Sequence, residues 1–286
     1  MRVGSGMMPL VYRWHRLTLV VQDWWLTTLG RAFWRDGDLV SFPIATFDRI
    51  DILVDRTIPS ILSQTHQSIE VVVALDGTPP ELLSRLEEVA DPRVRFVRLA
   101  RRTKYPPAPK DRWMVAGWRP RNFASTRARG SWIYWISDDD VLEPNAVAKL
   151  LEVARRESVE VVSGSYLSGS LTPVVHGPAE GLDNFGVPIS GPPVWMCKRY
   201  LGRFRWNRFS WCKRWNRPSD YDLIERMVKR KVTFAGTDEI LAIQPDVEGS
   251  AHAGLQGALD IAATDAFQKT SKKSSRKNKD RGAGRG

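Results

Sequence analysis

Residues 132–140, Trp-Ile-Tyr-Trp-Ile-Ser-Asp-Asp-Asp, decide how the rest of this chain is interpreted. Five bulky apolar residues follow one another without alternation, which favours a short strand covered on both faces. The strand ends directly in Asp138, Asp139 and Asp140, and Pro144 then opens a helical pattern. Carboxylates at the carboxyl end of a buried strand lie where open α/β sheets bind ligands. Such a triplet is typical either of a Mg²⁺ or Mn²⁺ site or of a solvated loop.

The flanking sequence repeats this strand-and-helix alternation. Strand-like runs occupy residues 39–46, 69–75, 94–99 and 159–162, and helical patterns occupy residues 54–62, 80–89, 113–129 and 147–154. Pro59 is expected to kink or restart the first of these helices. A loop with three prolines is expected at residues 101–112, and Gly130 is expected to stop the helix before the acidic strand. Alternating strands and helices predict an α/β fold with a mainly parallel, doubly wound sheet.

Acids and hydroxyls follow three of the predicted strands. Thr46 and Asp48 end the first, Asp76 follows the second, and Asp138 follows the pivotal one. In a parallel sheet these ends meet at one edge, so we expect a site for a polar, nucleotide-bearing ligand and a metal ion. The first strand is followed by neither a Gly-x-Gly-x-x-Gly motif nor a Gly-Lys-Ser/Thr loop, so neither a dinucleotide fold nor a P-loop is supported.

Charge and cysteine content narrow the class of protein. The chain has 286 residues and a net charge of +11, of which +7 comes from residues 268–286 with eight Lys or Arg and one Asp. That tail is too polar to fold alone, and it is interpreted as a disordered solubilising tail or as a contact for anionic lipid or nucleic acid. Cys197 and Cys212 are the two cysteines, and they fit packing residues in a reducing compartment.

The first 38 residues form a Trp-rich amphipathic segment. Apolar residues recur at helical spacing at Leu10, Trp14, Leu17, Val21 and Trp24. The uncharged runs are too short to span a membrane, and no secretory cleavage site follows them. Three interpretations remain open: a helix packed on the domain, an interfacial membrane helix, or translated sequence upstream of the true start.

Six short motifs follow one another between about residues 40 and 243. They are Ala-Thr-Phe-Asp-Arg at 45–49, Ser-Ile-Leu-Ser-Gln-Thr at 60–65, Leu-Asp-Gly-Thr at 75–78, Arg-Asn at 121–122, Ser-Asp-Asp-Asp at 137–140 and Ser-Asp-Tyr-Asp-Leu-Ile-Glu-Arg at 219–226. This order resembles that of the family-2 glycosyltransferases, which are inverting enzymes of the GT-A fold that use nucleotide-diphospho-sugars. The resemblance covers roughly seven-tenths of the chain.

The resemblance implies a role for each matching residue. Asp76 would hold the nucleotide base, Thr46 and Asp48 would lie near the base and ribose, and Asp138 would lie near the ribose. Arg121 and Asn122 would belong to the same donor site. Asp139 and Asp140 would hold Mn²⁺ or Mg²⁺ against the diphosphate, and Asp220 would be the catalytic base. Asp220 also opens a helical pattern, where an acid suits the helix dipole, so a capping role is the alternative.

Three positions depart from the family pattern. Leu75, Ser137 and Ser219 each stand where the family usually has an acid. The triplet still provides an acid at every position after the first, so metal binding is expected to survive. A stabilised negative charge on the leaving phosphate and a base on the opposite face of the sugar are what inverting transfer needs.

A segment rich in Trp and Arg at residues 191–215 is a candidate acceptor site, with Trp195 and Arg199 as its leading residues. Aromatic faces stack on sugar rings and Arg binds phosphate, but the same residues also suit core aromatics with solvated arginines. Single-stranded nucleic acid suits interleaved Trp and Arg as well, although the acid-lined site argues against it. His252, after the last strand-like run, is a further candidate metal ligand.

The sequence therefore predicts three parts: residues 1–38, a GT-A-like domain at 39–250, and an extension at 251–286. The expected function is metal-dependent, inverting transfer of a sugar from a nucleotide-diphospho-sugar to a hydroxyl of a glycan, lipid or protein-linked acceptor. We expect a cytoplasmic protein with peripheral membrane contact through residues 1–35 and the basic tail. The alternatives are a nucleotidyltransferase and a non-catalytic carbohydrate- or nucleic-acid-binding protein with an eroded site.

Overall fold

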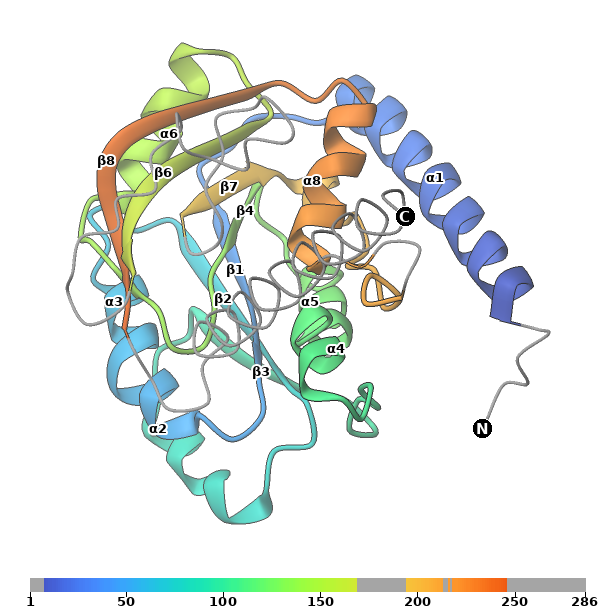
Figure 1. The fold of residues 1–286 in the computed structure, drawn as a ribbon. Helices are drawn as coiled ribbons and strands as arrows, with labels where there is room; N and C mark the ends of the chain where they lie inside the picture. Colours follow the sequence, from blue (N-terminus) through green and yellow to red (C-terminus); the bar gives the residue numbers. More distant parts are fainter. Residues whose placement is uncertain (1–7, 169–193, 213–215, 217, 246–286) are drawn as a thin grey trace, which may run out of the picture.

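An eight-stranded sheet forms the centre of the computed structural model, which describes residues 8–168, 194–212, 216 and 218–245 (Figure 1). Its order is β3-β2-β1-β4-β7-β6-β8-β5. The strands are β1 (Val40–Thr46), β2 (Ile69–Leu75), β3 (Val94–Arg98), β4 (Trp132–Trp135), β5 (Val141–Leu142), β6 (Val161–Ser168), β7 (Trp195–Lys198) and β8 (Phe234–Gln244).

Most of the neighbouring strands run parallel, as the sequence predicts. β3, β2, β1 and β4 form a parallel set, and β6 pairs with β8 in the same way. β7 is antiparallel to both β4 and β6, and β5 is antiparallel to β8. The mainly parallel α/β prediction is therefore confirmed, with antiparallel strands beyond β4.

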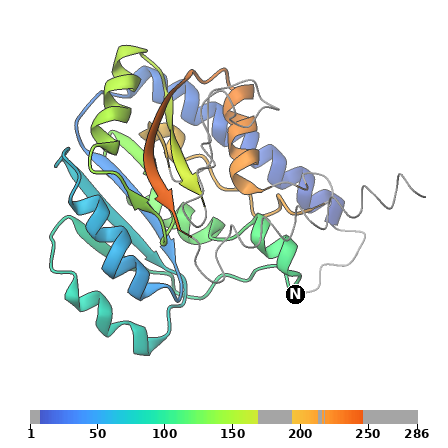
Figure 2. The ribbon, with the colours of Figure 1, turned by 60° about the vertical axis from the view of Figure 1, so that its left-hand side comes forward.

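Helices cover both faces of the sheet (Figures 1 and 2). One face packs against α2 (Ile50–Ile52), the π-helical turn η1 (Leu53–Thr57), α3 (Ile58–Leu62) and α6 (Ala146–Arg156). The other packs against α5 (Trp118–Ser125), α7 (Arg199–Gly202) and α8 (Ser219–Lys229). The remaining helices are α1 (Met8–Phe33), α4 (Pro109–Met114) and the 3₁₀ turns η2 (Pro80–Leu82) and η3 (Ser84–Glu88).

β4 is the most deeply buried part of the acidic motif. Trp132 and Tyr134 enter the core beneath α2, α3 and α6, whereas Ile133 and Trp135 enter the core beneath α7 and α8. Each of the four is at most 1% exposed. Because successive side chains of a strand point to opposite faces, an apolar residue is needed at every position.

Several helix predictions need correction. The helix expected at 113–129 is two helices, because Gly117 has φ +70° and interrupts the helical conformation between α4 and α5. The helix expected at 80–89 is a pair of 3₁₀ turns, and the loop expected at 101–112 already becomes helical at Pro109. The expected restart at Pro59 is confirmed: the π-helical turn η1 ends at Thr57, and α3 begins at Ile58 with Pro59 in its first turn.

The N-terminal helix α1 packs on the domain, but not with the face that its sequence pattern suggests. The residues turned inward include Leu19, Asp23 and Thr27, which are at most 2% exposed. The Asp23 carboxylate lies 2.7 Å from the Arg226 guanidinium of α8. The apolar stripe of the sequence analysis, including Trp14 and Trp24, is instead exposed. Among the described residues no helix is both long and apolar enough to cross a membrane.

Candidate active site

The strand ends that the sequence singled out come together around one hollow of about 500 Å³. Parallel pairing of β1 and β2 continues past both strands, where the Asp76 amide donates to the Thr46 carbonyl at 2.9 Å. The hollow is lined by predicted residues and their neighbours, among them Thr46, Asp48, Asp76, Arg121, Asp138 and Asp139. Its volume lies within the range of small-ligand pockets.

Asp76 fixes the far wall of this hollow. Its Oδ1 accepts hydrogen bonds from the Thr103 amide at 2.8 Å and hydroxyl at 2.6 Å. Its Oδ2 accepts one from the Tyr105 hydroxyl at 2.8 Å. The loop after β3 is therefore held against the end of β2. Each carboxylate oxygen can accept more than one hydrogen bond, so Asp76 can still accept one from a ligand.

Arg49 lies among the acids that follow β4. Its guanidinium is 2.6 Å from Asp139 Oδ2 and 3.4 Å from Asp138 Oδ1. Burial, followed by the charge of Asp139, raises the pKa of Asp138 to about 6, although Arg49 acts in the opposite direction. One arginine therefore neutralises only part of the negative charge that the strand end gathers.

Asp140 is the acid that most lacks a partner. It is fully buried, and its Oδ2 accepts the Ser137 amide at 2.8 Å, while Oδ1 has no hydrogen-bond partner in the described part of the chain. Burial and the charges of Asp139 and Asp138 raise its pKa to about 8. An orphaned buried carboxylate oxygen beside two other acids fits a hard divalent cation.

The cation that fits here would complete its coordination from the substrate. In the described residues no three carboxylate, imidazole or thiol groups converge as a ready-made metal cage. Mg²⁺ is usually held by one or two carboxylates plus water and substrate phosphates rather than by such a cage. Asp139 and Asp140 are therefore suited to hold a cation jointly with a diphosphate.

Arg121 links the acids to the start of α8. It lines the hollow, and its guanidinium lies 3.5 Å from the Ser137 hydroxyl. Its charge counteracts the effect of burial, which raises the pKa of Asp220 at the beginning of α8. Burial, then the charges of Asp140 and Asp220, raise the pKa of Tyr166. The charge of Arg121 also acts on Asp140, so Asp140 and Asp220, which are far apart in sequence, both lie within electrostatic range of Arg121 and Tyr166.

Three predicted residues lie elsewhere. Asn122 does not line this hollow: its side chain exchanges two hydrogen bonds with the Trp206 backbone, at 2.9 and 3.3 Å. Trp195 is fully buried in the core beneath α8, so the core interpretation holds for it. Arg199 follows Lys198, which pairs with Trp132 at the amino end of β4, the edge opposite the acids. His252 lies outside the described residues.

Sequence reasoning missed several residues of the hollow. Arg49 stood inside a motif but received no role, and Arg102, Tyr105, Trp113 and Gln244 also line the hollow. Arg102 covers the Phe47 ring at 3.5 Å. The basic residues could have been predicted from the sequence, because four or more acids at one sheet edge need positive charge nearby. Tyr105 and Trp113 carry no such signal in the sequence, because the direction of their side chains depends on how the chain between β3 and α5 folds.

The sequence also matches the model of a protein family. The model of "Glycosyl transferase family 2" matches residues 41–108 and 118–215, which is more than half of the chain. The chain belongs to glycosyl transferase family 2. The gap in the match, residues 109–117, coincides with α4 and the break at Gly117.

Two curated relatives match part of this glycosyltransferase. The succinoglycan biosynthesis protein ExoO of Rhizobium meliloti is 30% identical over 122 residues, 43% of this chain and 31% of that protein. An uncharacterized glycosyltransferase of Haemophilus influenzae is 23% identical over 116 residues, 40% of this chain and 32% of that one. Each match covers about a third of the relative's length.

Solved structures share the GT-A fold. S. aureus TarS 1–349 in complex with UDP has a TM-score of 0.55 and 13% identity, over 72% of this chain and 60% of that one. The mannosyltransferase PcManGT of Pyrobaculum calidifontis, in complex with GDP-Man and Mn²⁺, has a TM-score of 0.56 and 12% identity, over 87% and 70%. At these identities the likeness supports the fold, and the ligands belong to those proteins.

Proposed function

We propose that this glycosyltransferase moves a sugar, with inversion and with a divalent cation, from a nucleotide-diphospho-sugar to an acceptor hydroxyl. The observation that carries the proposal is that Arg121, which lines the hollow beside Asp138 and Asp139, lies close enough to Asp140 and to Asp220 for its charge to lower the pKa of both. One acid belongs to the cluster at the sheet edge and the other opens α8. Inverting transfer needs this division, because the cation and the base act on opposite sides of the reacting carbon.

The donor would occupy the hollow at the sheet edge. Asp76 would hold the base, Thr46 and Asp48 would lie near base and ribose, and Asp138 would lie near the ribose; all four residues line the hollow. Asp139 and Asp140 would hold Mn²⁺ or Mg²⁺, which stabilises negative charge on the leaving phosphate. Arg49, now paired with Asp138 and Asp139, would exchange its carboxylate partners for phosphate oxygens when the donor binds.

Asp220 would act as the general base. Burial raises its pKa, so its carboxylate is a stronger proton acceptor than an exposed one. It would take the proton from the acceptor hydroxyl as that oxygen attacks the anomeric carbon. A single base and no enzyme nucleophile give one displacement, and therefore inversion of the anomeric configuration.

A donor panel tests this proposal. The full chain is incubated with UDP-, GDP- and dTDP-sugars and Mn²⁺, and release of nucleoside diphosphate is followed with and without chelator. We expect release from one donor class, lost with chelator, and a transferred sugar of inverted configuration by NMR. Release of pyrophosphate from a nucleoside triphosphate and sugar phosphate would instead identify a nucleotidyltransferase. Binding of sugars without any turnover would identify an eroded, non-catalytic site.

We also propose that the enzyme works in the cytoplasm, in peripheral contact with a membrane through α1. The exposed face of α1 carries Leu10, Trp14, Leu17, Val20, Val21, Trp24, Trp25, Leu29 and Phe33, each at least 44% exposed. A continuous apolar helix face with Trp residues is typical of helices that lie in a lipid headgroup layer. Trp24→Ser with Phe33→Ser should reduce sedimentation of the full chain with phosphatidylglycerol vesicles. Unchanged sedimentation would contradict the contact.

A further inference from the structure

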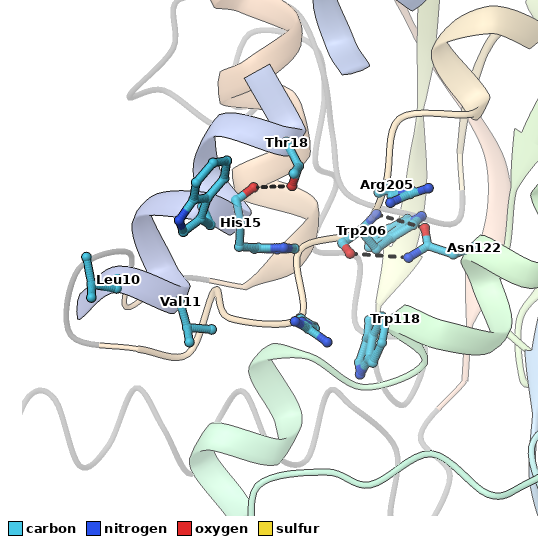
Figure 3. A pocket seen from close by; sticks show the side chains of 10 residues that line it. Leu10, Val11, His15, Thr18, Trp118, Asn122, Arg205 and Trp206 are labelled. Carbon is cyan, nitrogen blue, oxygen red and sulfur yellow. Dashed lines mark hydrogen bonds between the residues drawn. The ribbon is translucent and has the colours of Figure 1, made fainter. Parts of the chain in front are cut away.

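A second hollow, of about 620 Å³, is lined by residues of α5 other than those that line the donor hollow, and Figure 3 shows it from close by. α1, α5 and the loop before α8 build it. It is lined by Leu10, Val11, Trp14, His15, Thr18, Trp118, Asn122, Arg205, Trp206 and Arg208. Trp118 and Asn122 face this hollow, whereas Pro120 and Arg121 of the same helix face the donor hollow. The two hollows therefore share one wall.

The walls of this second hollow are held by specific contacts. Figure 3 shows the two hydrogen bonds that join the Asn122 side chain to the Trp206 backbone. The Arg121 guanidinium stacks at 4.8 Å from the Trp206 ring. On the opposite side, His15 of α1 is 3.0 Å from the Asn207 side chain. The hollow is therefore a built feature, and Arg121 with Trp206 connects it to the catalytic acids.

The chemistry of the lining is apolar with positive charge. Trp14 and Trp118 offer aromatic surface to a ligand, whereas Trp206 is only 2% exposed, and Arg205 and Arg208 are exposed. The lining contains no Asp or Glu, and within the described residues neither arginine lies within ion-pair distance of a carboxylate. His15 adds no charge near neutral pH, because burial lowers its pKa to about 4.

The hollow also opens onto the exposed apolar face of α1. Leu10 and Trp14 belong to both, at 58% and 67% exposure. A ligand can therefore place a charged group against Arg205 and Arg208 and continue along α1 with a hydrocarbon chain. A water-soluble glycan would leave this apolar surface unmatched.

We propose that the second hollow binds the acceptor as an amphiphile, through a phosphate group attached to a long hydrocarbon chain. The arginines would hold the phosphate, Trp14 and Trp118 would contact the first part of the chain, and the acceptor sugar would reach past Trp206 and Arg121 toward Asp220. This inference rests on the proposed function, because it names the acceptor class for the same transfer.

Binding of farnesyl monophosphate to the full chain tests the proposal. Calorimetry below the micellar concentration, with EDTA to leave the donor site without cation, should give saturable binding of one molecule per chain. Farnesol and inorganic phosphate should each bind at least about tenfold more weakly, because each lacks one half of the ligand. Equal binding of farnesol or of inorganic phosphate would overturn the proposal, and so would the absence of saturable binding.

Matched variants separate the hollow from its surroundings. Arg205→Gln with Arg208→Gln, and separately Trp14→Ala, should weaken farnesyl monophosphate binding at least about tenfold. Arg203→Gln and Arg16→Gln, exposed residues of the neighbouring surface that do not line the hollow, should leave it unchanged. Equal weakening by both sets would indicate general lipid adhesion and overturn the proposal.

Donor binding is the arm that tests the proposed function separately. Affinity for nucleoside diphosphate with Mn²⁺ should be the same in wild type and in all four variants. If farnesyl monophosphate binds as expected while no nucleotide-sugar is turned over, the proposed transfer fails and the lipid-phosphate site stands. If nucleotide-sugars are turned over while farnesyl monophosphate does not bind, the acceptor proposal alone fails.

Discussion

The two hollows lined by α5 have opposite chemistry. The donor hollow gathers Asp48, Asp76, Asp138 and Asp139 around two of its arginines, Arg49 and Arg121. The second hollow combines Trp and aliphatic side chains with two arginines and contains no acid. They differ in origin as well: the first is built from turns that follow strands together with α4 and α5, and the second from three segments that are far apart in sequence.

The two sides of α5 therefore differ in how their charges are compensated. At the edge of the donor hollow, the acids Asp138, Asp139 and Asp140 outnumber their arginine partner Arg49, and burial makes this local negative charge costly unless a cation binds. The second hollow holds exposed positive charge, which water solvates at little cost. The first is therefore poised for a cation and the second for an anion, and Arg121 stands at the boundary between them.

Asp220→Asn should have the largest effect on the donor side. Asn keeps the shape at the start of α8 but removes the basic oxygen, so transfer should fall by about 10²- to 10⁴-fold. Donor affinity should stay within a few-fold of wild type. Rate, affinity and melting temperature are measured on one preparation.

Asp222→Asn is the matched control for that experiment. Asp222 is 2% exposed and binds Arg226 at 2.9 Å and Asn207 at 3.0 Å, so its role is structural. This variant should lower the melting temperature and leave turnover per folded molecule nearly normal. A wild-type rate in Asp220→Asn would place the base elsewhere.

Asp23→Ala should disturb the packing of α1, and with it the second hollow, while leaving the first hollow intact. Burial raises the pKa of Asp23 even though Arg226 is adjacent, so this pair contributes little net stability. Removing only the acid still leaves a buried Arg226 with half its neutralisation, at a cost of about 3 kcal/mol. Thermal unfolding measures the loss, and the exposed neighbour variant Trp24→Ala should change stability by less than about 0.5 kcal/mol. Equal effects of the two variants would contradict the role of the pair.

Asp139→Asn with Asp140→Asn should abolish the cation dependence of donor binding. The two acids lie at the end of β4, so their amides should leave the core intact. Nucleoside diphosphate affinity with Mn²⁺ should fall at least about tenfold, to the value that wild type shows with chelator. Calorimetry measures both. Unchanged affinity in the double variant would rule out these acids as ligands.

The pH dependence of stability should show the smallest effect. The pKa of Asp140 is about 8 in the folded protein against an ordinary value of 3.8, so the folded state binds more protons than the unfolded state between these values. Stability without metal should therefore fall as pH rises through this window, by about 1 kcal/mol per unit near pH 6–7. Asp140→Asn should flatten the profile of melting temperature with chelator present. A slope that is equal in the variant would assign it to other groups.

The sequence predicted the donor edge because its information is local. An unbroken apolar run makes a doubly covered strand, and residues directly after it cannot lie anywhere but the strand's carboxyl end. Thr46, Asp76 and Asp138 are therefore found where they were expected. Arg49 follows β1 just as closely, but its pairing with Asp139 depends on two strand ends that meet only in the sheet.

The two residues of the Arg-Asn motif show the limit of that reasoning. Arg121 faces the donor hollow and Asn122 faces the other, because successive residues of a helix point about 100° apart. Which of them meets the donor depends on how α5 is set against β1 and β2 after the break at Gly117. Sequence spacing alone gives the angle between the two side chains, but not the direction of either.

Periodicity and chain order are enough to predict the sheet, its buried strands and the acids at one edge from the sequence. The orientation of α1 and the hollow beneath it depend instead on contacts between segments that are far apart in sequence. The amphipathic pattern favours burial of the apolar stripe, yet Asp23 is buried and Trp14 and Trp24 are exposed. The reason is Arg226 on α8, more than two hundred residues away along the chain, whose buried guanidinium pairs with Asp23 of α1 as well as with Asp222 of its own helix.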